Sequence, residues 1–146
     1  MDAPFRHMHA LEEVITTDVT RALEEDVRSG DLTALLIPAA ARGRARVIAR
    51  EEGVIAGCAW FERCFTKLDP DCEVFWHVAD GEGVSENMQL CEITGNARAM
   101  LTAERTALNF LQSMSAIATE TRRFVTAVID TKAKILDTRK TMPGLR

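Results

Sequence analysis

Residues 94–146 decide the fold of this chain and read TGNARAMLTAERTALNFLQSMSAIATETRRFVTAVIDTKAKILDTRKTMPGLR. Asn96 follows Gly95 and can cap a helix, and no glycine or proline comes after it until Pro143. At about 100° per residue, one broad arc of this helix is apolar. The arc comprises Met100, Leu101, Ala103, Ala107, Leu108, Phe110, Leu111, Met114 and Ala118. The pattern predicts a long amphipathic helix with one buried face.

The opposite arc of this helix is polar or small. It comprises Thr102, Arg105, Thr106, Asn109, Gln112, Ser113 and Ala116. Arg105 and Asn109 are a helical turn apart, so we expect them to be neighbours. Glu104 instead falls within the apolar arc, where an ionised carboxylate needs a partner. The sequence therefore predicts that Arg105 points away from the core and that Glu104 is buried and paired.

A short apolar run, Lys134 to Thr138, follows the helix and has the pattern of a buried strand. Arg139 and Lys140 come directly after it. In parallel α/β barrels, ligands and catalytic groups gather at the carboxyl ends of the strands. Arginine binds a carboxylate or phosphate through its bidentate fork, and lysine binds it as a compact charge. The run therefore predicts either an anion site or a basic face that meets only water.

The charge is distributed unevenly along the chain. Residues 122–146 carry seven Lys or Arg against two acids, a net +5, whereas residues 1–121 carry 11 against 20, a net −9. A basic end on an acidic body favours a local anionic ligand over a polyanion, so we expect no nucleic-acid partner. The length of 146 residues and the hydrophobic share of 47% are ordinary for one compact globular domain.

The four cysteines, Cys58, Cys64, Cys72 and Cys91, show no CxxC spacing and lie away from the histidines, so we expect no metal site. Each has apolar neighbours, where a free thiol behaves as a small buried hydrophobe. No signal peptide and no apolar run of membrane-spanning length is present, so we predict no membrane association and a reducing cytoplasm.

The first third of the chain predicts helices and then a strand. We expect residues 1–10 to be a loose lead and the helical pattern after it to fall in two pieces, the second starting at Thr17 or Asp18 and ending at Ser29-Gly30. Glu25-Asp26 and Ser29–Thr33 then offer either backbone capping, which we favour, or a metal site. Residues 42–50 alternate small and basic side chains and predict a half-buried strand.

The middle of the chain completes an α+β pattern. Residues 60–68 show helical spacing that ends at Asp69-Pro70, residues 73–79 alternate as a strand, and residues 88–93 form another strand after a glycine turn. Helices with a small antiparallel sheet indicate an α+β layer domain. We place a domain boundary between residues 115 and 116.

Several runs together resemble one enzyme family. They are Glu104–Gln112, Ile135–Arg146, Glu25-Asp26, Gly30–Thr33, Ala49–Glu51, Gly53–Gly57 and Asp80-Gly81. In register from about residue 21 onward, they look like nicotinate-nucleotide pyrophosphorylase (carboxylating), also called quinolinate phosphoribosyltransferase. One departure is Ala116, where the family usually has glycine. The extra methyl group is expected to tighten a helix contact or to narrow a substrate-facing gap.

The resemblance implies a fold and a reaction. The fold is an amino-terminal α/β sandwich with an antiparallel sheet in residues 1–115, followed in residues 116–146 by the first helix and strand of an α/β barrel. The reaction is phosphoribosyl transfer from phosphoribosyl pyrophosphate to quinolinate with loss of CO2 and pyrophosphate, giving nicotinate mononucleotide for NAD biosynthesis. Mg²⁺ is expected to come with phosphoribosyl pyrophosphate, and its protein ligands are expected outside these residues.

The resemblance also implies roles for individual residues. Arg105 would bind a quinolinate carboxylate in the partner's site of a homodimer with shared active sites, or of a hexamer. Thr138 and Arg139 would hold quinolinate, and Lys140 would be catalytic, between the dicarboxylate and the phosphoribosyl donor. Glu104 would be a buried partner for an arginine.

Most of a barrel of ~250 residues would lie beyond these residues, so the chain is expected to be an amino-terminal portion that is inactive alone. Two alternatives stay open. One is a paralogous pyrophosphorylase-like protein of molybdate transport. The other is a non-catalytic dimerisation or regulatory domain, in which the exposed barrel strand would need to pair with something.

Overall fold

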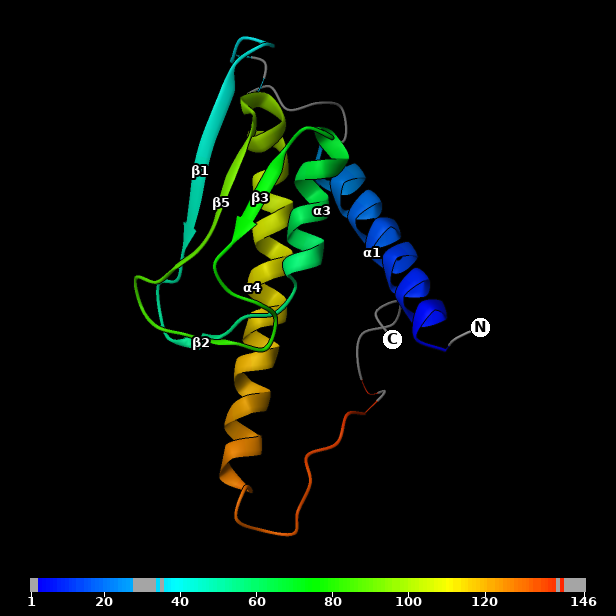
Figure 1. Ribbon diagram of the computed structural model, residues 1–146, viewed down its shortest axis with the longest axis vertical. Coiled ribbons are helices and arrows are strands. Elements are labelled where there is room, and N and C mark those ends of the chain that lie inside the picture. Colours follow the sequence, from blue (N-terminus) through cyan, green and yellow to red (C-terminus); the bar gives the residue numbers. More distant parts are fainter. Residues whose placement is uncertain (1–2, 28–33, 35, 139, 141–146) are drawn as a thin grey trace.

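A computed structural model describes residues 3–27, 34, 36–138 and 140 of the chain. Its elements are α1 (Ala3–Val27), β1 (Arg42–Ile48), β2 (Gly53–Val54), α3 (Cys58–Leu68), β3 (Glu73–Trp76), β4 (Gly83–Val84), β5 (Gln89–Asn96) and α4 (Ala97–Ala127). A layer of strands lies against a layer of helices, and the end of α4 extends well beyond the sheet (Figure 1).

The main sheet has the strand order β1-β5-β3, and both pairings are antiparallel. The central strand β5 aligns Gly95 with Gly43 of β1, and Ile93 with Val74 of β3. A second, two-stranded sheet joins β2 to β4. The predicted α+β class with an antiparallel sheet is confirmed.

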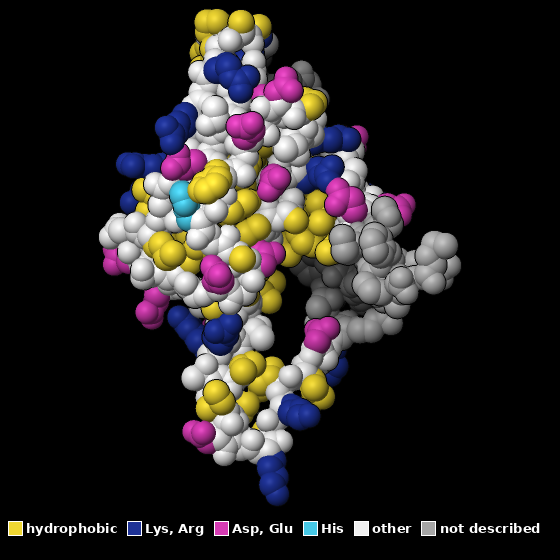
Figure 2. All heavy atoms as spheres, viewed as in Figure 1, with side chains coloured by type: hydrophobic (Ala, Val, Ile, Leu, Met, Phe, Trp, Pro, Cys, Tyr) yellow, Lys and Arg dark blue, Asp and Glu magenta, His cyan; other side chains and the backbone are white. Residues whose placement is uncertain are grey.

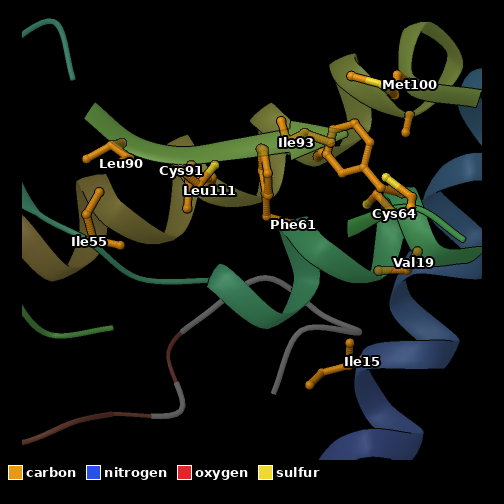
Figure 3. Packing of buried hydrophobic residues seen from close by; sticks show 14 of the residues in the cluster. Ile15, Val19, Ile55, Phe61, Cys64, Leu90, Cys91, Ile93, Met100 and Leu111 are labelled. Atoms are coloured by element: carbon orange, nitrogen blue, oxygen red, sulfur yellow. The ribbon is translucent and has the colours of Figure 1, made fainter. Parts of the chain in front are cut away.

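The core lies between β5 and the three helices (Figure 3). Phe61 of α3 is 1% exposed, and its ring centroid is 5.0 Å from that of Phe65 and 5.2 Å from that of Trp76. Two cysteines complete this centre, and burial raises the pKa of Cys64 and of Cys91 to about 12. Both thiols therefore stay protonated near neutral pH and act as small apolar side chains.

The prediction of a loose lead and a divided helix is wrong, because α1 runs unbroken from Ala3 to Val27. Ile15, Val19 and Leu23 recur every fourth residue and are all buried, so one continuous stripe holds the helix on the core. Asp18 is not a cap; its Oδ2 accepts a hydrogen bond from Trp60 Nε1 at 3.1 Å. The predicted helix end at Ser29-Gly30 and the capping or metal role of residues 29–33 lie outside the described residues.

The start of α4 is as predicted, but its buried face is not. Asn96 Oδ1 accepts hydrogen bonds from the backbone N–H groups of Arg98 and Ala99. Thr106, expected on the polar arc, is buried, and Glu104, expected to be buried and paired, is exposed. The reason is that α3 packs on α4. The face of α4 that this contact buries includes Ala103, Thr106 and Ala107, and Glu104 lies outside it.

Residues 134–138, expected to form a buried strand, are extended without strand pairing. Ile135 is 43% exposed and Leu136 is 77% exposed. In the described part of the chain no strand lies beside this run, so its N–H and C=O groups have no ladder to join. The segment turns at the end of α4 and runs back from it (Figure 1).

Candidate functional site

Arg105 projects outward from α4, as the sequence predicted. Its side chain is 77% exposed, and its Nη1 lies 3.4 Å from Oδ1 of Asp26, whose side chain is 25% exposed. The neighbours of Arg105 explain this orientation, because Thr106 and Ala107 are both turned into the core. Arg105 therefore stands on a fixed helix with its guanidinium available to an anion.

The other predicted site residues lie on the segment after α4. Thr138 and Lys140 are both exposed, and the backbone N–H of Lys140 donates to Thr138 Oγ1 at 3.4 Å. Arg139 lies outside the described residues. Among the described residues, Arg105 makes no hydrogen bond or ion pair with Thr138 or Lys140. Their shared role stays a prediction.

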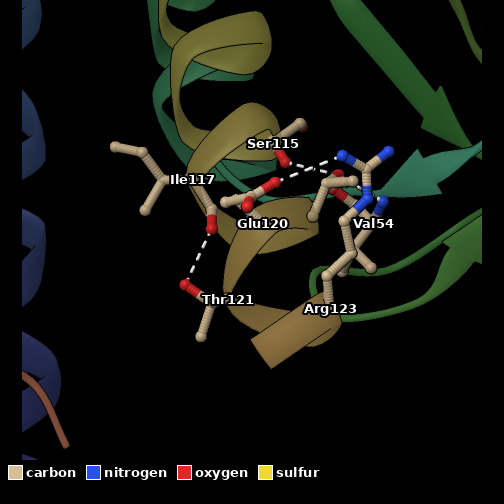
Figure 4. A network of polar contacts seen from close by, with 7 residues as sticks. Val54, Ser115, Ile117, Glu120, Thr121 and Arg123 are labelled. Carbon is tan, nitrogen blue, oxygen red and sulfur yellow. Dashed lines mark hydrogen bonds and ion pairs between the residues drawn. The ribbon is translucent and has the colours of Figure 1, made fainter. Parts of the chain in front are cut away.

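Two hydroxyl groups of α4 hold the helix against β2 and the residues that follow it. Figure 4 shows Ser115 and the following turns of α4 beside Val54 of β2. Thr119 Oγ1 accepts a hydrogen bond from the backbone N–H of Val54 at 2.8 Å, and Ser115 Oγ accepts one from the backbone N–H of Ala56 at 3.1 Å. Residues i and i+4 of a helix are about as far apart as residues i and i+2 of a strand. The helix therefore supplies acceptors where a neighbouring strand would.

The glycines beside this contact permit the close approach. A Cβ at Gly53 would lie 2.9 Å from Thr119 Oγ1, and a Cβ at Gly57 would lie 2.8 Å from Met114 Sδ. Sequence analysis noted the run Gly53–Gly57 only as part of the family resemblance and did not assign it this role. The signal that could have indicated this contact is the pair of hydroxyl residues Ser115 and Thr119, four apart on a helix, together with two glycines four apart.

A groove of about 1070 Å³ lies between β1, β2 and α4. Its walls combine apolar residues such as Val47 and Leu108 with charged residues of both signs, for example Arg46 and Glu104. Ala116, the departure from the family pattern, is exposed and lines this groove. A mixed wall of this kind suits a partner surface better than a small dianion, which needs convergent cations.

Neither a metal centre nor a membrane span is found in the described part of the chain. No three His, Cys, Asp or Glu side chains there are grouped so that they would hold a metal ion. No helix there has both the length and the apolar character needed to cross a bilayer.

Comparison with known proteins shows which family this sequence and this fold resemble. Residues 15–115 match the family described as quinolinate phosphoribosyl transferase, N-terminal domain, and residues 117–146 match the C-terminal domain of the same family. The chain is similar, at TM-score 0.86 and 39% identity, to the structure of the nicotinate-nucleotide pyrophosphorylase from Francisella tularensis, with 90% of this chain and 47% of that chain covered.

Curated relatives agree with the structural match. The chain is 43% identical over 127 residues to quinolinate phosphoribosyltransferase [decarboxylating] 2a, mitochondrial, of Nicotiana tabacum, covering 86% of this chain and 36% of the relative. It is 42% identical over 130 residues to nicotinate-nucleotide pyrophosphorylase [carboxylating], chloroplastic, of Oryza sativa subsp. japonica, covering 88% and 34%.

An antiparallel sheet covered by helices is thus the fold of a quinolinate phosphoribosyl transferase amino-terminal domain. The chain belongs to the quinolinate phosphoribosyltransferase family. It spans less than half the length of these relatives.

Proposed function

We propose that the protein containing these residues transfers a phosphoribosyl group from phosphoribosyl pyrophosphate to quinolinate and releases pyrophosphate and CO2. The observation that carries the proposal is the match to both domains of one family, which continues through Lys140 to residue 146. In the reaction, the ring nitrogen forms a bond to the anomeric carbon, and pyrophosphate leaves with the electron pair of the broken C–O bond. The electron pair of the carbon–carboxylate bond then stays on the ring carbon next to the cationic nitrogen as CO2 departs, and a proton from water forms the new C–H bond of the product.

The residues of this chain would bind and orient the dicarboxylate. Arg105 offers a fork of N–H donors to one carboxylate, Thr138 offers a hydroxyl group, and Arg139 and Lys140 offer adjacent cations. Lys140 would stand between quinolinate and the phosphoribosyl donor, where it would neutralise charge on both reactants. Holding the two reactants in line supplies much of the rate enhancement in reactions of this kind.

Arg105 is exposed on α4, which fits an active site completed by a second copy. A homodimer in which Arg105 enters the partner's site is therefore part of the proposal, and so is a cytoplasmic location, which the free thiols support. Among the described residues, no three His, Cys, Asp or Glu side chains are grouped so that they would hold a Mg²⁺ ion. We therefore assign Mg²⁺ to phosphoribosyl pyrophosphate, and it would supply charge neutralisation for the leaving pyrophosphate.

The test uses the full-length protein encoded by the reading frame that contains these residues. Nicotinate mononucleotide formation from quinolinate and phosphoribosyl pyrophosphate with Mg²⁺ is expected. In the Lys140→Ala variant, kcat/KM is expected to fall by about 100-fold or more, as when a preorganised donor is removed from an active site. Lys134→Ala removes another exposed lysine of the same segment and should leave the rate unchanged.

Two outcomes would contradict the proposal. One is turnover of a different pyridine acid with no turnover of quinolinate, which would favour the paralogous protein. The other is full activity of the Lys140→Ala variant, which would remove this lysine from the site. The polypeptide of residues 1–146 by itself is expected to form no nucleotide, because it carries only part of the proposed site.

A further inference from the structure

The last turn of α1 concentrates negative charge where a helix tolerates it least. Glu24, Glu25 and Asp26 are consecutive, and this turn contains no basic residue. The C-terminal end of a helix carries a partial negative charge, so acids near it are unfavourable. Helix stability therefore does not explain Asp26, whose side chain instead contacts another element.

That contact is with Arg105 of α4. The Nη1 atom of Arg105 lies 3.4 Å from Asp26 Oδ1, and the carboxylate, at 25% side-chain exposure, is much less accessible than the guanidinium at 77%. The carboxylate stands on a fixed support, because Val19 and Leu23 hold the same end of α1 in the core. Arg105 is therefore held from one side by a group that cannot easily move.

The geometry of the guanidinium leaves it able to bind a second anion. Arginine has five N–H donors in a planar fork, and a contact through Nη1 leaves the donors on Nη2 and Nε. A free, exposed arginine side chain would lose much of its rotamer freedom on binding. A carboxylate that already restricts the side chain reduces that loss, although it also competes for the positive charge.

We propose that Asp26 is a positioning residue, which holds the Arg105 guanidinium in the orientation that receives a quinolinate carboxylate. The inference rests on the proposed function for the identity of the anion. In this proposal orientation outweighs charge competition, because the contact with Asp26 is made through Nη1. The pair also gives the acidic stretch at Glu25-Asp26 a role other than capping or metal binding.

The kinetic test compares Asp26→Asn with Glu12→Gln in the full-length protein. Glu12 lies on the same helix and pairs with Arg63 of α3, so its variant is a matched loss of one ion pair from α1. Asp26→Asn is expected to raise KM for quinolinate roughly fivefold, the upper range for a partly exposed ion pair, with KM for phosphoribosyl pyrophosphate unchanged. Glu12→Gln should change neither constant.

A double-mutant cycle then separates positioning from a structural effect. In an Arg105→Ala background, Asp26→Asn should cause no further rise in KM for quinolinate, since the two residues act through one contact. Asp26→Glu should recover part of the affinity. An unchanged or lower KM in Asp26→Asn would overturn the inference and show that the carboxylate only competes with the substrate, while activity of the parent protein would still uphold the proposed function.

A measurement without turnover covers the case in which the parent protein does not convert quinolinate. The NMR signal of the Arg105 Nε–H group reports how ordered the side chain is on the ps–ns timescale. Asp26→Asn should lower the heteronuclear NOE of this signal in the 146-residue chain, and Glu12→Gln should not. An unchanged value in Asp26→Asn would overturn the positioning role whatever the outcome of the assay.

Discussion

The two parts of the chain on either side of residue 116 use similar apolar residues with opposite results. In residues 15–115, Phe61 and Leu111 are 1% and 3% exposed. In residues 117–138, Ile117 is 69% exposed, Phe124 is 54% exposed and Leu136 is 77% exposed. Figure 2 shows hydrophobic side chains on the surface of the lower part of the molecule, where α4 extends beyond the sheet.

The contrast shows that an apolar pattern specifies burial without specifying what covers it. The core of the first part is covered within the described chain, because α1, α3 and β5 all pack on α4 or on one another, while Leu36 and Phe75 of that part stay exposed. The second part matches the C-terminal domain of the family, and its apolar side chains face solvent here. Contiguous exposed apolar surface marks a contact site for another domain or chain.

The largest expected difference between the two parts is the loss of stability when one phenylalanine is truncated in each. Phe61→Ala should lower the free energy of unfolding by about 3–5 kcal/mol, because it removes contacts with Phe65 and Trp76 and leaves a cavity. Phe124→Ala should change it by less than about 0.5 kcal/mol, as for an exposed site. Urea unfolding of the 146-residue chain, followed by circular dichroism, measures both. Equal losses would mean that Phe124 is covered in solution.

Much of the first part could be predicted from the sequence. The alternation around Val47 and Val74, the Asn96 cap and the turn at Gly81 depend on neighbours close in sequence, and period and capping chemistry report such neighbours directly. The errors came from tertiary contacts. Asp18 has the sequence pattern of a helix cap, but its carboxylate instead accepts a hydrogen bond from Trp60. Packing against α3 places Thr106 on the buried face of α4.

The candidate site was less accessible to sequence reasoning. The outward position of Arg105 follows from helical period alone and is confirmed. Its partner Asp26 is 79 residues away along the chain, and nothing local connects the two. The strand expected at residues 134–138 failed because pairing is a property of two segments, and apolar composition reports only one of them.

Two glycines test how tightly α4 is packed, because a Cβ would meet a side chain of α4 at Gly57 and open space at Gly81. Gly57 and Gly81 have φ angles of +98° and +90°, so a Cβ strains both backbones similarly. At Gly57 the Cβ would also meet Met114 Sδ at 2.8 Å, whereas at Gly81 it would meet nothing within 4 Å. Gly57→Ala should cost about 2–4 kcal/mol and Gly81→Ala about 1–2 kcal/mol in thermal unfolding. Equal costs would show that Met114 moves aside freely.

The smallest expected effect comes from removing a hydrogen bond between the two parts, from Val54 of the first to Thr119 of the second. Thr119→Val keeps the shape of the side chain but removes the acceptor for the Val54 backbone N–H, now at 2.8 Å from Oγ1. Val54 is 8% exposed, so leaving its backbone N–H unpaired should lower the free energy of unfolding by about 1–2 kcal/mol. Thr121→Val is the matched control, because Thr121 Oγ1 only donates to the carbonyl of Ile117 at 2.7 Å on the exposed side.

Amide hydrogen exchange distinguishes the two roles that Thr119 can have. If the hydroxyl group fixes α4 against β2, Thr119→Val should speed exchange at Val54 and along α4 after Ser115, and Thr121→Val should not. Faster exchange at Val54 alone would mean that the contact satisfies one donor without holding the helix. The exposed half of α4 would then be held only by its continuity with the buried half, and its direction would be set by whatever covers Ile117 and Phe124.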